Sequence, residues 1–258
     1  MSASDGSESD SAATKRPFHY RFLKKQRHRA NKIIASSSLI SNAPVLDSDS
    51  FDWTSELALH WQAIRDEALA IFRHKQAIPP LREISPDHRR IMRDNSWRSF
   101  FLVGYGNLIA KNMARAPITS RLVQSIPALN SAFFSILAPG AVIVPHRGVS
   151  KAIITAHLGL TVPQEGEKCW MRVHDQKLHW REGEWTVFDD TYEHEVRNET
   201  DETRIVLLCQ IVRPLRAPGS WLAKATLDYV RRSGFVQDAK NNLADWETVY
   251  AKAETEGL

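Results

Sequence analysis

Residues 131–214 read SAFFSILAPGAVIVPHRGVSKAIITAHLGLTVPQEGEKCWMRVHDQKLHWREGEWTVFDDTYEHEVRNETDETRIVLLCQIVRP. Short runs of aromatic and β-branched residues alternate here with turn signals such as Pro139-Gly140 and Arg147-Gly148. The apolar runs are Phe133–Leu137, Ala141–Val144, Ile153–Leu160, Cys169–Val173, Leu178–Trp180, Trp185–Phe188 and Ile205–Val212. Strands spaced this closely leave no room for crossover helices, so the pattern predicts an all-β sandwich or barrel.

Helical patterns lie on both sides of this β region. Thr54 is a good N-cap for a helix over residues 54–74, and 117–129 predict a short helix between two prolines. Residues 96–105 predict a strand, and the chain turns helical again after Pro218. We therefore expect one domain over 51–258, with its β core at about 131–214 and a helical extension over 219–256.

The N-terminal segment has a different composition. Residues 1–14 are rich in Ser, Asp, Glu and Ala, residues 15–32 hold eight Lys and Arg, and residues 35–50 resemble a linker. We therefore predict a disordered, basic arm and linker over 1–50. The arm could be a solvated tail, a localisation signal, or a contact through 15–32 with a polyanion or, peripherally, with anionic lipid.

The composition excludes several classes of protein. Residues 33–258 carry nearly equal numbers of basic and acidic side chains, so no nucleic-acid partner is expected for the folded body. Two cysteines, Cys169 and Cys209, cannot form a disulfide framework. No apolar run reaches the length of a membrane span, and no secretory pattern opens the chain. We expect a cytoplasmic protein, and the oligomeric state stays open.

Two histidines and one arginine stand out in the β region. His146 leaves a strand into the turn His146-Arg147-Gly148, and His194 follows the polar turn after Phe188. Imidazole suits Fe, Zn, Cu and Ni, and histidines on neighbouring strands can take adjacent coordination positions. Arg204 opens a near-continuous apolar strand, where a buried guanidinium needs an anion. These residues suggest a metal site that also binds a carboxylate, although a pair of hydrogen-bonded barrel histidines would give the same spacing.

The segment from Phe51 to Pro214 resembles the aspartyl/asparaginyl β-hydroxylase family of Fe(II)- and 2-oxoglutarate-dependent oxygenases. The matching stretches are FSILAPGAVIVPHRG (134–148), AHLGLTVP (156–163) and FDDTYEHEVRNETDETRIVLLCQIVRP (188–214). Upstream, Phe51-Asp52-Trp53-Thr54, Trp61, Ile64-Arg65 and Trp97–Phe101 also match. The resemblance implies a mainly β fold, a double-stranded β-helix or jelly roll of the cupin type, braced by the N- and C-terminal helices.

The resemblance also implies roles for particular residues. His146 and His194 would be the iron ligands, and Arg204 would bind the far carboxylate of 2-oxoglutarate. Ser135 and His157 would be further contacts to this cosubstrate, although a strand serine and a core histidine can be purely structural. The implied cofactors are Fe(II), 2-oxoglutarate and O2.

Two positions bear on the substrate. Gly148 stands where many oxygenases of this chemistry carry a carboxylate ligand. The protein-modifying hydroxylases of the resembled family carry glycine there, whereas its lipid A hydroxylase relatives carry aspartate. The glycine leaves space for a water or a halide, and Asp189, Asp190, Glu193 or Glu195 could supply a carboxylate or orient a histidine. Thr155 replaces an arginine that helps to hold the cosubstrate in the protein-modifying branch.

Taken together, these features predict a dioxygenase that hydroxylates an unactivated C–H bond. Gly148 favours the β-carbon of Asp or Asn in a peptide or protein. A lipid acyl chain or a small amino-acid-type metabolite is the alternative within the same chemistry. A non-catalytic β-barrel that binds a metal or an anion is the alternative from another class. The residues that select the substrate are expected within 75–95 and 107–130.

Overall fold

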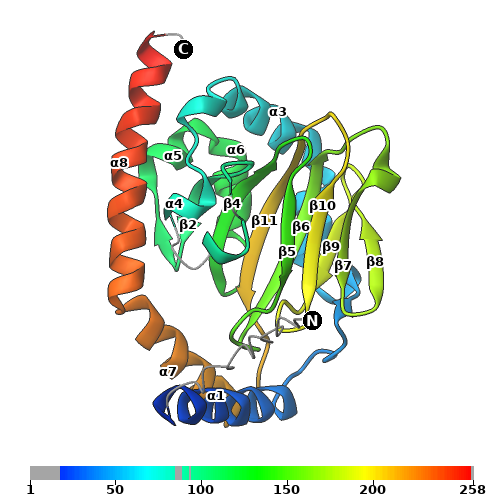
Figure 1. Cartoon of the computed structure of the whole chain (residues 1–258), viewed down its shortest axis with the longest axis vertical. Coiled ribbons are helices and arrows are strands. Elements are labelled where there is room, and N and C mark those ends of the chain that lie inside the picture. Colours follow the sequence, from blue (N-terminus) through cyan, green and yellow to red (C-terminus); the bar gives the residue numbers. More distant parts are fainter. Residues whose placement is uncertain (1–17, 85–88, 93, 257–258) are drawn as a thin grey trace, which may run out of the picture.

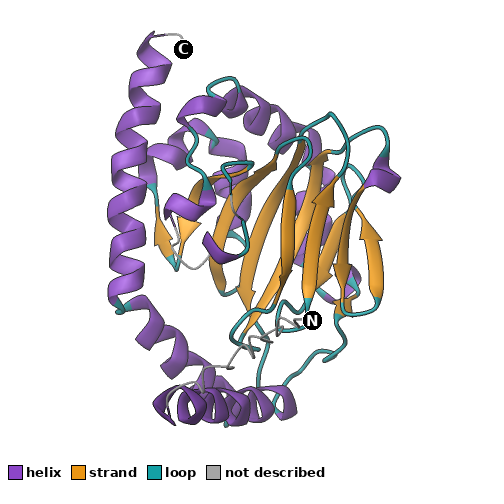
Figure 2. Cartoon of the chain, viewed as in Figure 1, coloured by secondary structure: helices purple, strands orange, loops and turns teal. Residues whose placement is uncertain are grey.

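The structure is a computed structural model that describes residues 18–84, 89–92 and 94–256. Two antiparallel sheets face each other (Figures 1 and 2), one with strand order β1-β9-β6-β11-β4-β2-β3 and one with order β5-β10-β7-β8. The strands are β1 (Val45–Leu46), β2 (Trp97–Gly104), β3 (Asn107–Leu108), β4 (Leu129–Leu137), β5 (Val142–His146), β6 (Ile153–Thr161), β7 (Cys169–Val173), β8 (Gln176–His179), β9 (Trp185–Phe188), β10 (His194–Asn198) and β11 (Arg204–Val212).

Helices lie before, between and after the strands. They are α1 (Phe18–Ser36), α2 (Trp53–Leu59), α3 (Trp61–Phe72), α4 (Leu81–Ile84), α5 (Ala110–Arg115), α6 (Pro117–Gln124), α7 (Gly219–Arg231) and α8 (Gly234–Glu256). In Figure 1, α1 and α7 lie together at one end of the sheets, and α8 runs along their side. Among the described residues, no helix is both long and apolar enough to cross a bilayer.

The large sheet has an apolar core on each of its faces. Side chains alternate between the faces of a strand, and β11 shows this clearly. Leu207 and Cys209 pack in the core that includes residues of α2, α3 and α6, whereas Val206 and Leu208 pack between the two sheets. Arg204 shares the face of Val206 by the same alternation, so this arginine points between the sheets.

The expected double-stranded β-helix with helices at both ends is confirmed. The strands predicted at Cys169–Val173 and Trp185–Phe188 have the expected bounds, and the others agree within a few residues. Three strands were not predicted, namely β1, β3 and β10. The single helix expected over 54–74 is divided at His60, whose backbone leaves helical values.

The prediction of an arm and linker over 1–50 is wrong for the part that the structure describes. Residues 18–36 form α1, in which Ile34 is buried against Ala152 and Ala223. The expected linker 35–50 is packed, because β1 pairs with β9 and Ser38 forms a bridge with Leu215. The folded part therefore begins before Phe51. Residues 1–17, the first part of the expected disordered arm, lie outside the described residues.

A buried ion cluster attaches this segment to the barrel. Arg213, at the end of β11, is 1 % exposed and pairs with the fully buried Asp189, which also binds Lys151. Arg213 also donates hydrogen bonds to the carbonyls of Lys151 (2.8 Å) and Ser41 (3.0 Å) and to the hydroxyl of Ser38 (3.1 Å). One guanidinium thus connects β11, the loop before β6 and residues 38–41.

Replacing Arg213 with methionine is expected to lower the free energy of unfolding by about 3–5 kcal/mol, because Asp189 would lose a buried partner. Urea denaturation measures this change. Arg181→Met is the matched control, since the side chain of Arg181 is 77 % exposed and such changes usually stay within about 0.5 kcal/mol. Equal stability of the two variants would contradict the role given to the cluster.

Candidate active site

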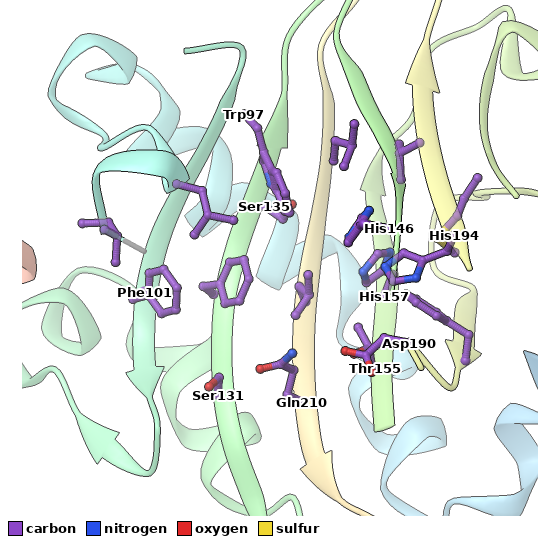
Figure 3. A pocket seen from close by; sticks show the side chains of 18 of the residues that line it. Trp97, Phe101, Ser131, Ser135, His146, Thr155, His157, Asp190, His194 and Gln210 are labelled. Atoms are coloured by element: carbon purple, nitrogen blue, oxygen red, sulfur yellow. The ribbon is translucent and has the colours of Figure 1, made fainter. Parts of the chain in front are cut away.

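A cavity of about 120 Å³ lies between the two sheets. It is lined by all five residues singled out in the sequence, which are Ser135, His146, His157, His194 and Arg204. The histidines come from both walls, since His157 lies on β6 of the large sheet and the other two on the small sheet. Figure 3 shows the three imidazoles gathered at one side of the cavity. The alternation of strand side chains brings these distant residues together.

His146 and His194 lie opposite each other on the paired strands β5 and β10. Their ring centroids are 4.0 Å apart. His146 Nδ1 lies 2.9 Å from the carbonyl of Val144, and His194 Nδ1 lies 3.0 Å from that of Tyr192. A carbonyl oxygen only accepts, so each Nδ1 carries the proton and donates it. Both rings therefore keep the lone pair on Nε2, which is the form that binds a metal.

Burial keeps both rings in this neutral form. It lowers the pKa of His146 below its ordinary value. Burial, with the nearby His146 as a smaller cause, lowers the pKa of His194 to about 4. Neutral imidazole is the ligating species, so at neutral pH neither ring must lose a charge before binding a metal ion.

Arg204 places an uncompensated positive charge beside this pair. Its side chain is fully buried, and Nε and Nη1 have no hydrogen-bond partner among the described residues. The guanidinium carbon lies 4.6 Å from the ring centroid of Trp180. Burial lowers the pKa of Arg204 to about 10, so the group stays charged at neutral pH. A buried charge with unused donors is costly unless an anion joins it.

His157 adds a further donor. Its Nδ1 accepts a hydrogen bond from Trp180 Nε1 at 3.3 Å, so the proton of the neutral ring lies on Nε2. Burial holds the pKa of His157 well below its ordinary value, and the charge of Arg204 lowers it further. The buried Nε2 has no partner. Arg204 and His157 together present unpaired N–H groups that fit a carboxylate.

Ser135 and Thr155 also line the cavity from the large sheet. Ser135 Oγ accepts a hydrogen bond from Trp97 Nε1 at 2.9 Å, and its own hydroxyl proton can rotate toward a ligand. Thr155 Oγ1 is buried without a partner. Gln210, which the sequence did not single out, lies in the cavity too (Figure 3). Every second side chain of β11 faces the same side as Arg204, so this alternation along the strand could have identified Gln210.

The prediction that Gly148 leaves open space is wrong. A Cβ atom at this position would overlap the carboxylate of Asp190, and Gly148 N donates to the Asp190 carbonyl at 2.7 Å. The carboxylate thus fills the space that the sequence left to a water or a halide. Asp190 Oδ1 is buried without a partner. Burial, with Asp189 as a smaller cause, raises the pKa of Asp190 to about 7.

The other acidic candidates do not line the cavity. Asp189 belongs to the ion cluster with Arg213 and Lys151. Glu193 and Glu195 both pair with Arg172. Of the four acidic residues considered, Asp190 is therefore the one at the site. Within 75–95, Leu81 and Ile84 line the cavity, whereas no residue of 107–130 does.

Gly148→Ala is expected to lower the free energy of unfolding by about 1–3 kcal/mol, because the new methyl group must displace a buried carboxylate. Asp190→Ala should relieve this cost, so the double mutant should show a coupling of about 1 kcal/mol or more. Urea denaturation at fixed pH gives the four values. Gly166→Ala is the control, since nothing lies within 4 Å of a Cβ there. Additive effects would contradict the packing of Asp190 against Gly148.

The residues present fit an iron ion with an acidic cosubstrate. Within residues 18–84, 89–92 and 94–256, no group of three or more His, Cys, Asp or Glu could hold a metal ion by itself. The site instead offers two neutral imidazoles with the same tautomer. Next to them lie the unpaired buried donors of Arg204 and His157.

Comparisons with known proteins identify relatives of the chain. The model of the family described as aspartyl/asparaginyl beta-hydroxylase matches residues 58–214. An ornithine lipid ester-linked acyl 2-hydroxylase of Rhizobium tropici is 38% identical over 216 residues, which are 83% of this chain and 77% of that protein. The aspartyl/asparaginyl beta-hydroxylase of Homo sapiens is 28% identical over 167 residues, or 63% of this chain and 21% of that protein.

Among solved structures, the cupin_2 domain of an XRE family transcriptional regulator from Enterobacter cloacae is similar to part of the chain. The match covers 47% of this chain and 99% of that one, at 14% identity and a TM-score of 0.30. The double-stranded β-helix is therefore assigned from the strand order described above. By the match over residues 58–214 and the similarity to the Rhizobium tropici hydroxylase, the chain belongs to the aspartyl/asparaginyl β-hydroxylase family.

Proposed function

We propose that the protein is an Fe(II)- and 2-oxoglutarate-dependent dioxygenase that hydroxylates the acyl chain of a lipid. The observation that carries the chemistry is the arrangement of one cavity. His146 and His194 present metal-binding nitrogens there, and the buried Arg204 and His157 present unpaired donors beside them. A zinc- or anion-binding barrel without activity would need only one of these two features.

Each group has a defined part in this proposal. His146 and His194 would hold the iron, and Arg204 would bind the far carboxylate of 2-oxoglutarate with a charge-assisted, two-point contact. His157 and Ser135 would donate further hydrogen bonds to the cosubstrate. Iron with 2-oxoglutarate, when bound, supplies the oxidising power that activates O2 for attack on a C–H bond.

The apolar walls of the cavity would exclude water from the reaction. Phe188 lies against both His157 and His194, with ring centroids 5.2 Å and 5.5 Å apart. Met171 and Ile143 of the small sheet are buried beside them. A dry cavity strengthens the contact between Arg204 and a carboxylate, because charges attract more strongly at low dielectric.

Three observations favour a lipid over Asp or Asn as substrate. In the sequence, Gly148 favoured a peptide or protein substrate. In the structure, the Asp190 carboxylate occupies the space that this glycine was expected to leave open. Thr155 differs from the arginine of the protein-modifying branch. The similarity to the lipid hydroxylase covers 83% of the chain, against 63% for the human enzyme.

Turnover of 2-oxoglutarate in the presence of separate lipid and peptide pools tests this proposal. We expect succinate to form and a lipid species to gain one oxygen atom in mass spectrometry. Oxidation of an Asp- or Asn-containing peptide, with the lipids unchanged, would show the other substrate class. The absence of succinate with every pool would favour a non-catalytic barrel. A chlorinated product in the presence of chloride would contradict simple hydroxylation.

The location of the protein follows from the same proposal. A lipid hydroxylase must reach its substrate in a bilayer. Each basic residue of 15–32 that lies near a surface of anionic lipid would add about 1 kcal/mol to the free energy of membrane binding. We propose a cytoplasmic protein that associates with a membrane surface. Sedimentation with vesicles of anionic lipid, compared at low and high salt, measures that association.

A further inference from the structure

The catalytic cavity is small for a lipid. Its volume is about 120 Å³, whereas sites for drug-sized ligands usually occupy about 300–1,000 Å³. A second cavity of about 570 Å³ lies next to it, between α1, α7 and the ends of the strands. Tyr105, Asp190 and Gln210 line both cavities. The larger space therefore adjoins the site of the two histidines, with these three side chains at the junction.

The walls of the second cavity are mainly apolar. Ile34 of α1, Ile153 of β6, and Leu227 and Val230 of α7 line them. Ile34 is 1 % exposed and Leu227 and Ile153 are each 9 % exposed, so these side chains are almost completely shielded from solvent. Binding of a hydrocarbon chain is stabilised in proportion to the apolar area that the contact removes from water. Such walls suit an acyl chain better than a polar peptide.

Polar side chains also line the cavity, among them Arg27, Asn130, Gln210 and Arg231. Arg27 of α1 lines it and also lines an adjoining hollow of about 430 Å³ with His28, Arg147 and Thr191. Arg147 faces Glu193 at 3.6 Å on the surface. The residues that line the hollow include no Asp or Glu. This hollow suits the negatively charged head group of a lipid, next to the apolar space for its chain.

Helix α1 is attached directly to the active-site loop. Asn31 donates to the carbonyl of Val149 at 3.3 Å and accepts from the backbone N–H of Lys151 at 3.0 Å. These two contacts place α1 over the loop that follows the proposed iron ligand His146. A molecule seated against α1 would therefore lie at the mouth of the catalytic cavity.

The outer surface of the helix pair has the composition of a membrane-facing element. Trp221 and Tyr229 on α7 are 72 % and 78 % exposed. Arg27, Arg29 and Lys32 are exposed on α1. Exposed Trp and Tyr suit the membrane–water interface, and Lys and Arg attract anionic head groups. In Figure 1, α1 and α7 lie side by side at one end of the molecule, where both can meet one surface.

We propose that the cavity between α1 and α7 binds the acyl chain of a membrane lipid and that Arg27 contacts its anionic head group. The pair α1–α7 rests on the bilayer and delivers the lipid to the neighbouring histidine site. This inference rests on the proposed lipid hydroxylation, because it names where that substrate is held.

Photo-crosslinking tests the site without turnover. The probe is a phosphatidylglycerol with a diazirine in one acyl chain, carried in phosphatidylcholine vesicles and mixed with the full chain. Mass spectrometry of the digested protein should place most crosslinks on residues that line the cavity, such as Ile34, Leu227 and Val230. Crosslinks confined to other surfaces would overturn the proposal.

Matched variants sharpen this test. Val230→Trp fills the cavity and should reduce crosslinking at least about ten-fold, since excluding two methylenes already corresponds to that factor. Ala225→Trp, on the exposed side of the same helix, should leave crosslinking unchanged. Arg27→Glu should weaken it more than Arg29→Glu, which makes the same charge change away from the cavity. Equal effects within either pair would overturn the assignment.

The outcomes separate this inference from the proposed function. Crosslinking in the cavity without oxidation of any lipid would remove the hydroxylation but keep the lipid site. Oxidation of lipids without crosslinking in the cavity would keep the hydroxylase and reject the second cavity as the acyl-chain site.

Discussion

Replacing His194 with alanine is expected to weaken the binding of Fe(II), or of its redox-inert substitute Mn(II), by more than about 100-fold. Losing even a residue that only hydrogen-bonds to a metal ligand typically weakens metal affinity by about 10- to 100-fold, and His194 is proposed to be a ligand itself. His194 supplies one of the two imidazoles whose ring centroids lie 4.0 Å apart in the cavity. Succinate formation should fall with metal binding. Titration of Mn(II) followed by electron paramagnetic resonance measures the affinity directly.

The control is His174→Ala, because the side chain of His174 is 56 % exposed at the surface. Metal affinity should be unchanged in that variant. A purified His194→Ala protein that binds Mn(II) as tightly as the unchanged chain would show that this imidazole is a core residue. Circular dichroism checks that the variant is folded, so loss of binding is separated from loss of structure.

Arg204→Met is expected to raise the KM for 2-oxoglutarate by about 10- to 100-fold, because a charge-assisted hydrogen bond contributes about 1.5–3 kcal/mol. The effect on kcat should be smaller, since the proposed role of the arginine is to anchor the carboxylate that lies away from the iron. Steady-state rates of succinate formation at varied 2-oxoglutarate measure both quantities.

The same variant separates binding from structure. Methionine removes a buried charge whose Nε and Nη1 have no partner in the protein. Without cosubstrate, the thermal stability of Arg204→Met should therefore be equal to or above that of the unchanged chain. The stabilisation that 2-oxoglutarate gives should disappear, because a ligand stabilises only the state it binds. A variant with reduced stability and an unchanged KM would make Arg204 a structural residue.

Arg204 and Arg213 show what distinguishes the two kinds of buried arginine. Arg204 opens β11 and Arg213 directly follows it, and both are 1 % exposed. Arg213 has a carboxylate and four other oxygen acceptors around it, so its removal should be costly to the fold. Arg204 lines a cavity and has unused donors, so its removal should be costly to ligand binding.

Much of the β core could be predicted from the sequence because its signal is local. The apolar runs and turn residues lie within a few positions of each other, and the face of each strand follows from the two-residue period. His146, His157 and Arg204 therefore fall on known faces once the strands are placed. The roles of these residues came from the resemblance to a family, since ten histidines offer many pairs with suitable spacing.

Other features could not be predicted because they depend on contacts between distant segments. Residues 35–50 look like a linker by composition, but contacts with Arg213, the Ser38–Leu215 bridge and the pairing of β1 with β9 hold them in place. The Asp190 carboxylate lies over Gly148 through the path of two loops, which no local pattern encodes. The cavity between α1 and α7 likewise lies between helices that are far apart in the sequence.

The most direct test is a crystal structure of the protein grown without oxygen in the presence of Fe(II) and 2-oxoglutarate, with anomalous data collected at the iron edge. We expect one strong iron peak in contact with Nε2 of His146 and His194, and the far carboxylate of 2-oxoglutarate on Arg204. An iron peak away from both imidazoles, or a cosubstrate that leaves Arg204 without an anion, would contradict the oxygenase site.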